Sequence, residues 1–177
     1  MSIQGWMKLS GAACIVLGAA GTGIWFAARY RQRIAELEQL KQMVFLLKGQ
    51  ILYANAPLSE AMETVGRRMD GALGTLFLET AASIEKRPGE PFLNIWREGA
   101  SRLDGKTALS KSDRQTLTAL GEHLGFLDRE TQERTLLLYL EQVDTELQAL
   151  REHRQERCRL YTSLGIMGGL FLAVILV

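Results

Sequence analysis

The chain has few residues of the kinds that build metal sites and disulfide frameworks. Among 177 residues there are two histidines and two cysteines. Neither His123 nor His153 has a cysteine or carboxylate at metal-ligand spacing, and Glu122-His123 lacks the second histidine of a zinc-protease helix. Cys14 lies in an apolar stretch and Cys158 among arginines, so a disulfide between them is not expected. The sequence therefore predicts no metal site and no catalytic constellation.

Signals for nucleotide or nucleic-acid binding are also missing. The glycines Gly18, Gly21 and Gly23 lie inside an apolar stretch and do not follow a strand, so they do not form a phosphate-binding loop. No Walker lysine accompanies them. The formal net charge is +1, from 21 basic and 20 acidic residues, which implies no basic patch for nucleic acid. We expect no cofactor and no enzymatic activity, and a function that lies in a protein surface.

Charged residues are absent from two long stretches, one at each end of the chain. Leu9 to Ala28 gives twenty residues without Asp, Glu, Lys, Arg or His, and Leu160 to Val177 gives eighteen. A helix needs about 20 apolar residues to cross a bilayer, with a lower limit near 17. The sequence therefore predicts transmembrane helices at residues 9–28 and 161–177, on either side of a central region at residues 29–160.

Arginines flank both stretches on the side of the central region. The first stretch is followed by Arg29, Arg31 and Arg33, and the second is preceded by Arg151, Arg154, Arg157 and Arg159. Because basic residues are retained on the cytoplasmic side during insertion, we expect a cell-membrane protein with a cytoplasmic central region. A cleavable signal peptide is the alternative for the first stretch. Twenty apolar residues followed directly by arginines are more typical of a stop-transfer segment.

Small residues recur at four-residue spacing in both stretches. Gly18 lies between Cys14 and Thr22, and Gly165 is followed by Gly169. Such a spacing lets membrane helices approach closely, which makes Gly18, Gly165 and Gly169 candidate helix-packing residues. Glycine is also common in membrane helices generally, so the spacing alone does not decide between the two interpretations. The absence of ionisable residues argues against a pump or channel.

The central region has helical periodicity and no alternation typical of strands, which predicts an all-α domain. Turn signals divide it into six helices. Pro57 suits the first turn of the second helix, and the third helix is expected at about residues 73–86. The fourth helix, from Phe92, is expected to stop at Asp104-Gly105.

Capping signals mark the last two helices of the central region. Ser112 and Gln115 have the spacing of a capping box, in which each side chain binds a free backbone amide of the other residue. They predict the start of the fifth helix. Gly125 is expected to end that helix, and Asp128 to cap the sixth.

The first and last of these helices carry heptad-like apolar stripes. The stripes are Leu37, Leu40, Val44, Leu47 and Ile51, and Leu136, Leu140, Val143, Leu147 and Leu150. We expect the two stripes to pack antiparallel within a six-helix bundle, whose long first and last helices continue into the terminal transmembrane helices. The alternative is a parallel homodimer through one stripe, which would make the protein a membrane-tethered coiled-coil scaffold or sensor.

Two segments at predicted helix junctions resemble a known family. They are Leu-Tyr-Ala-Asn-Ala-Pro-Leu-Ser-Glu-Ala at residues 52–61 and Gly-Glu-His-Leu-Gly-Phe-Leu-Asp-Arg-Glu-Thr-Gln at residues 121–132. With them the chain resembles, over essentially its full length, the stage III sporulation protein AB family of endospore-forming bacteria. The segments are also similar to the cytoplasmic helical domains of the inner-membrane platform protein of type II secretion and type IV pilus systems. Those proteins have a glycine where this chain has Ala56.

The resemblance implies a non-enzymatic membrane platform in the secretion-like channel complex between mother cell and forespore. It implies a location on the mother-cell side of the outer forespore membrane. The implied partners are a cytosolic ATPase of the stage III sporulation protein AA type, other membrane subunits of the channel, and the lipid bilayer. Folding roles are expected for Pro57, Gly121, Gly125 and Asp128. The candidate partner contacts are Glu122, Arg129 and Glu130.

Overall fold

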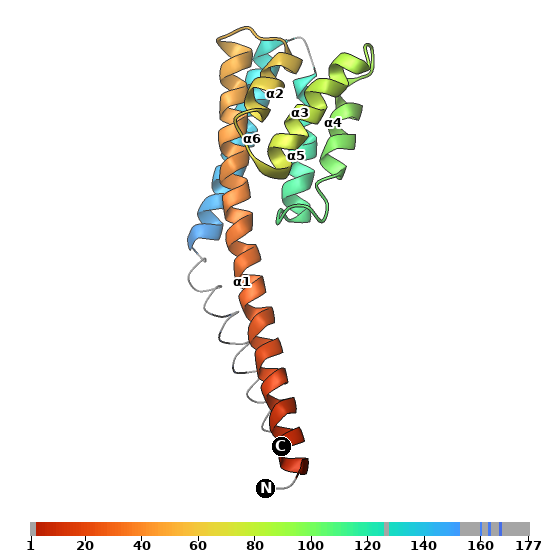
Figure 1. Ribbon diagram of the computed structural model, residues 1–177. Helices are drawn as coiled ribbons and strands as arrows, with labels where there is room; N and C mark the ends of the chain where they lie inside the picture. The colour runs from red at the N-terminus through yellow and green to blue at the C-terminus, as the bar shows by residue number, and fades with distance from the viewer. Residues whose placement is uncertain (1–2, 126–127, 153–159, 161–162, 164–166, 168–177) are drawn as a thin grey trace. The chain divides into compact units, whose positions relative to one another are not determined.

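The computed structural model describes residues 3–125 and 128–152, together with residues 160, 163 and 167. Over these residues the fold is all-α, with six helices and no strand (Figure 1), as the sequence predicts. The helices are α1 (Ile3–Leu52), α2 (Leu58–Gly66), α3 (Gly71–Lys86), α4 (Phe92–Ser101), α5 (Lys111–Leu124) and α6 (Arg129–Glu152). The chain divides into unit 1 (Met1–Gln32 and Ala149–Val177) and unit 2 (Arg33–Gln148), and both units include part of α1 and of α6.

Within unit 2 the α1 and α6 segments are antiparallel neighbours (Figure 1). Arg33 of α1 binds Glu146 of α6, and Lys41, two turns further along α1, binds Asp144, which precedes Glu146. The predicted stripes of both helices form core: Leu40, Val44, Leu47 and Leu136 are fully buried, and Leu37, Ile51, Val143 and Leu147 nearly so. Leu140 is only half-buried. The apolar stripe of α1 is therefore covered within a single chain.

Aromatic residues fill the core between α3, α4 and α5. The fully buried Trp96 of α4 packs edge-on against Phe77 of α3, with ring centroids 5.6 Å apart, and stacks on Phe92 at 5.9 Å. Its indole Nε1 donates a hydrogen bond to the carbonyl of Leu117, at 2.8 Å. A buried indole without an acceptor would lose a hydrogen bond, so this contact fixes the ring as well as burying it.

Several predicted helix boundaries shift by one to three residues in the structure. Pro57 is the residue before α2 rather than part of its first turn, and its carbonyl accepts the amide of Ala61 at 2.9 Å. Helix α3 begins at Gly71, where a φ of +80° favours glycine, and α4 ends at Ser101, before the predicted stop at residues 104–105. Ends of this kind depend on local turns, which periodicity does not resolve.

The predicted membrane segment at residues 9–28 lies within α1. The segment at 161–177 lies outside the described residues, apart from positions 163 and 167. In the part of the chain that the structure describes, no helix has both the length and the apolar character needed to cross a bilayer. The two transmembrane helices stay a prediction.

Candidate partner-binding site

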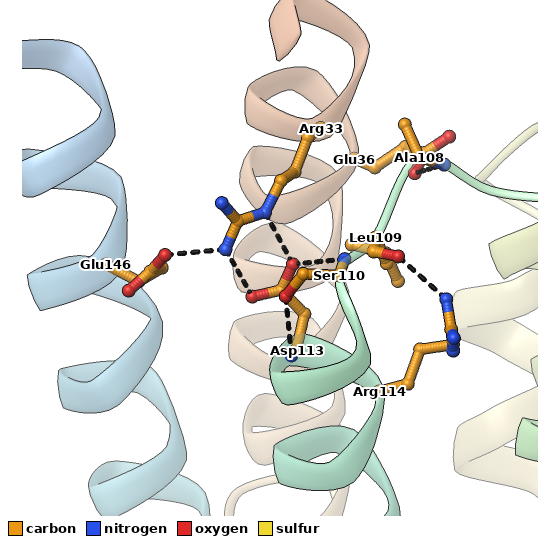
Figure 2. A network of polar contacts seen from close by, with 8 residues as sticks. All are labelled: Arg33, Glu36, Ala108, Leu109, Ser110, Asp113, Arg114 and Glu146. Atoms are coloured by element: carbon orange, nitrogen blue, oxygen red, sulfur yellow. Dashed lines mark hydrogen bonds and ion pairs between the residues drawn. The ribbon is translucent and has the colours of Figure 1, made fainter. Parts of the chain in front are cut away.

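A partly buried ion network joins three helices of unit 2 (Figure 2). The Arg33 guanidinium of α1 binds both carboxylate oxygens of Asp113 at the start of α5, at 2.7 and 2.8 Å. The same guanidinium binds Glu146 of α6 at 2.5 Å. Since the Asp113 side chain is only 5% exposed, it would be a costly buried charge without Arg33. The network therefore fixes the start of α5 against α1 and α6.

Asp113 also forms the capping box of α5, together with Ser110. The Asp113 amide donates to Ser110 Oγ at 3.1 Å, and the Ser110 amide donates to Asp113 Oδ2 at 2.7 Å. The prediction of a capping box at Ser112 and Gln115 is therefore wrong by two residues. Ser112 and Gln115 are exposed on the first turns of α5. The reciprocal bonding is the same as predicted, but it involves the preceding serine and an aspartate.

The network changes the pKa values of its members. Burial acts to raise the pKa of Asp113, but the hydrogen bonds from Arg33 and Ser110 outweigh it, and the pKa lies below its ordinary value of 3.8. The hydrogen bond to Asp113 raises the pKa of Arg33 above its usual range, against an opposing effect of burial. Burial raises the pKa of Tyr139, and the charge of Asp113 adds to this. Arg33 and Asp113 are thus a stable ion pair, and Tyr139 stays protonated.

The loop before α5 is held by further polar contacts (Figure 2). Glu36 of α1 accepts the backbone amide of Ala108 at 2.7 Å, and Arg114 donates to the carbonyl of Leu109 at 2.8 Å. These contacts satisfy backbone groups of a loop whose residues Thr107, Ala108 and Leu109 are buried. The network holds α1, α5 and α6 in position, so its role is structural.

An open groove of about 400 Å³ lies between α4 and α5, on the same unit. Small side chains line part of it, including Ala100 of α4 and Ala119 of α5. Half of the lining residues are charged: Arg97, Asp104, Lys111, Arg114 and Glu122. The predicted contact residue Glu122 therefore lies in a surface hollow, where it is exposed.

Among the residues that the structure describes, Glu122 and two cations of this groove have no ion-pair partner. Arg114 is paired with Asp104 at 3.0 Å. In contrast, Arg97, Lys111 and Glu122 are exposed and form no ion pair within the described part of the chain. A groove with small side chains and unpaired charges is suited to binding a segment of another protein.

The fold agrees with the family comparisons. The family profile described as stage III sporulation protein AB matches residues 8–177. The chain belongs to the stage III sporulation protein AB family. A curated family member, stage III sporulation protein AB of Bacillus subtilis (strain 168), is 26% identical over 170 residues, covering 96% of this chain and 99% of the relative. A solved structure titled stage III sporulation protein AB is similar in fold, with a TM-score of 0.65 at 22% identity over 71% of this chain and 98% of that one.

The two segments that carry the family resemblance lie at one end of unit 2. Residues 52–61 join α1 to α2, and residues 121–132 run from α5 to α6, apart from positions 126 and 127, which are not described. Because α1 and α6 are antiparallel, the end of α1 and the start of α6 lie at the same end of the unit (Figure 1). The two family segments therefore contribute to one surface, which we call the junction surface.

Two of the predicted folding residues, Gly121 and Gly125, touch α4. A Cβ at Gly121 would overlap the indole ring of Trp96, and one at Gly125 would come within 2.9 Å of Phe92 Cβ. Asp128 caps α6 as predicted, because its carboxylate accepts the Thr131 amide at 3.1 Å. Hydrogen bonds from Thr131 hold the pKa of Asp128 below its ordinary value.

The remaining predicted residues are placed as follows. Glu130 is exposed in the first turn of α6, while the Arg129 side chain lies outside what the structure describes. Gly18 is exposed on α1, and a Cβ there would meet no described atom within 4 Å. Gly165 and Gly169 lie outside the described residues. A packing role for these three glycines stays a prediction.

Neither the ion network nor the unpaired charges can be predicted from sequence patterns. In the sequence, Arg33 is a topology signal beside the first apolar stretch, whereas in the structure it pairs with a carboxylate 80 residues away. No local spacing encodes such a pair. In the described residues, no group of three or more His, Cys, Asp or Glu side chains is arranged to hold a metal ion.

Proposed function

We propose that this protein is a non-enzymatic platform subunit of a secretion-like sporulation complex, and that it binds a cytosolic ATPase of the stage III sporulation protein AA type. Membership of the stage III sporulation protein AB family supports the role in sporulation. The resemblance to secretion platform proteins suggests the ATPase. The proposed location is the mother-cell side of the outer forespore membrane, with other membrane subunits of the channel as further partners.

The junction surface is the observation that carries the ATPase-binding proposal. The Tyr53 side chain is 80% exposed at this surface, and Asp128 and Glu130 are exposed beside the start of α6. Asn55, between α1 and α2, has a φ of +55°, which is uncommon for a residue other than glycine. An exposed tyrosine on a fixed turn, with carboxylates on the neighbouring junction, has the character of a protein-binding surface.

Exposed apolar side chains in unit 1 support attachment to a bilayer. Ile24, Trp25 and Phe26 are consecutive on α1, and each is more than half exposed. Three such neighbours would be costly in water and favourable in lipid. Arg29 lies over the Trp25 ring, 5.3 Å from its centroid, as expected where an apolar helix meets the polar region of a membrane.

The alternative of a dimeric coiled-coil scaffold has less support. Its interface would be the α1 stripe, yet Leu40, Val44 and Leu47 are already fully buried in one chain. A second copy would have to displace α6 or the shorter helices to reach them. Exposed apolar residues elsewhere on α1 and α6, such as Phe45 and Leu138, do not lie on the stripes.

The test is co-purification of the full-length chain with the AA-type ATPase of the same organism. We expect the native chain to retain the ATPase, and Tyr53→Ala and Glu130→Lys each to reduce the retained amount at least tenfold. Phe45→Ala and Glu85→Lys are matched controls, since they alter an exposed aromatic and an exposed carboxylate away from the junction surface. A native chain that retains no ATPase, or equal losses in all four variants, would contradict the proposal.

A further inference from the structure

The groove between α4 and α5 has a shape that small residues create. Ala100 on α4 faces the groove, as do Thr118 and Ala119 on α5. Longer side chains at these positions would fill the space of about 400 Å³. A groove between two helices with small side chains accepts the side-chain ridge of a third helix.

The two ends of α5 carry charges that oppose the helix dipole. Lys111 is the first residue of α5, where the dipole favours a negative charge, and Glu122 lies in the last turn, where it favours a positive one. Both side chains line the groove. Neither has an ion-pair partner among the described residues, so no local interaction offsets these placements. Charges that weaken their own helix and remain unpaired are explained by a partner that supplies the opposite charges.

The positions of these charges define what the partner must carry. Lys111 and Glu122 are about 16 Å apart along α5, at 1.5 Å per residue, which is three turns of helix. Arg97 adds an unpaired cation on the α4 side of the groove. A complementary helix carries a carboxylate near its amino-terminal end, where it lies opposite Lys111. It carries a second carboxylate that faces Arg97. Near its carboxyl-terminal end it carries a basic residue that lies opposite Glu122. Acidic first turns and basic last turns are also the charges that stabilise a helix.

We propose that the α4–α5 groove binds one amphipathic, net-acidic helix of a partner protein, parallel to α5. Small apolar residues of that helix face Ala100 and Ala119. The inference rests on the proposed function only in assuming that this chain works by binding other proteins. The groove meets the junction surface at Glu122, and its other lining residues come from α4, α5 and the loop between them, outside both family segments.

The experiment places a photo-crosslinking amino acid at Ala119 of the full-length chain in sporulating cells. A matched probe at Ala82, exposed on α3, is the control. We expect a cross-link from position 119 and none to the same protein from position 82. Mass spectrometry of the cross-linked peptide is expected to identify a helix with the charge order given above. No adduct from position 119, or an adduct to a second copy of this chain, would overturn the proposal.

Charge variants separate partner binding from structural damage. Lys111→Glu and Glu122→Lys each replace a charge that opposes the dipole of α5 with one that complements it, so we expect the melting temperature to rise. We expect the same variants to lose most of the cross-link. Glu85→Lys makes the equivalent change in the last turn of α3, outside the groove, and should raise the melting temperature while leaving the cross-link intact. A cross-link that is unchanged in Lys111→Glu and Glu122→Lys would contradict the proposal.

The outcomes for the groove and for the ATPase are independent. Lys111→Glu is the variant that separates the two, because Lys111 lies outside the junction surface, whereas Glu122 belongs to both surfaces. Loss of the cross-link in Lys111→Glu with ATPase co-purification intact shows that this variant acts on the groove, and that the junction surface holds the ATPase by itself. Absence of any cross-link in the native chain, with the ATPase still bound, refutes the groove proposal alone. A cross-link to a membrane subunit in a chain that does not bind the ATPase refutes the proposed ATPase binding alone.

Discussion

Gly121 of α5 lies against the Trp96 indole of α4. A Cβ at this position would overlap the ring. The ring has little freedom to move away, because its Nε1 donates a hydrogen bond to the Leu117 carbonyl and the ring packs against Phe77 and Phe92. The absence of a side chain at this position is thus a packing requirement rather than a need for unusual backbone angles.

We expect Gly121→Ala to lower the free energy of unfolding by about 1–3 kcal/mol, the usual cost of an added methyl group in a filled core. Gly49→Ala is the matched control, because a Cβ at Gly49 meets nothing within 4 Å among the described residues. There the better helix propensity of alanine should raise stability by up to about 1 kcal/mol. Denaturant unfolding of the purified chain measures both, and equal effects would contradict the packing argument.

The Arg33–Asp113 pair predicts how stability depends on pH. Its geometry holds the pKa of Asp113 below the ordinary value of 3.8 in the folded chain. The stabilisation is therefore complete above pH 4 to 5 and is lost as the pH falls from about 3.8 through the folded-state pKa. Asp113→Asn should be less stable than the native chain at pH 7, and the difference should shrink below about pH 4. Thermal melts from pH 7 to pH 2.5 measure this, and a difference that grows on acidification would be inconsistent with it.

Residue-level prediction succeeded where the signal was local. Gly121, Gly125 and Asp128 belong to a short segment whose spacing already indicates a helix end and a new start. The sequence also names Glu122 as a candidate contact, and that role stays a prediction. It did not single out Arg97 or Lys111, because a charge becomes notable only when the structure shows it without a partner. The ion pairs of Arg33 could not be predicted either, because its partners lie 80 and 113 residues away in the sequence.

At the scale of the single helix, α5 shows how tertiary contacts choose between two start signals. Ser112-x-x-Gln115 matches the preferred capping-box pattern, whereas Ser110-x-x-Asp113 has an aspartate in place of Glu or Gln. The structure uses the second pattern, because Asp113 in that position also binds Arg33. The local preference for Gln is small compared with the cost of leaving Arg33 without its carboxylate.

This interpretation predicts different effects for two neighbouring serines. Ser110→Ala removes the acceptor of the Asp113 amide and should lower the free energy of unfolding by about 0.5–2 kcal/mol, as is typical for the loss of an N-cap. Ser112→Ala should change it by less than about 0.5 kcal/mol, because Ser112 is an exposed residue of the first turn. Denaturation of both variants side by side is the measurement. A larger loss of unfolding free energy in Ser112→Ala than in Ser110→Ala would contradict this interpretation and would favour a capping box formed by Ser112 and Gln115.

At the scale of the whole molecule, composition and periodicity were enough to predict an all-α chain and a bundle of six helices. Two heptad-like stripes at opposite ends of the central region indicated which helices form the long antiparallel pair. The arrangement of α2 to α5 was not predictable in the same way, since it depends on the fit of Trp96, Phe77 and Gly121 across three helices. Helix spacing alone does not specify such contacts.

The proposed membrane attachment gives a prediction for the intact protein. We expect the full chain to stay in the membrane pellet after an alkaline carbonate wash. Val16→Arg with Leu17→Arg places two charges in the first apolar stretch, each costing about 2.5–3.5 kcal/mol near a bilayer centre, and should reduce the retained fraction. Leu138→Arg, at an exposed position of α6 in unit 2, serves as the control and should not. Full release of the native chain by carbonate would contradict the attachment.

The pairing of α1 with α6 also has a consequence for synthesis on the ribosome. Trp96 and its acceptor on Leu117 are 21 residues apart, so the α4–α5 hairpin forms soon after both helices emerge. Arg33 and Glu146 are 113 residues apart. During most of translation, α6 has therefore not yet been made and cannot pack on the apolar stripe of α1. A chain that is cut short before residue 129 lacks α6, so the apolar side of α1 that faces α6 stays exposed, and exposed apolar surface of this kind makes a chain prone to aggregation. Completion of α6 is thus the step at which a finished protein becomes distinguishable from an aborted one.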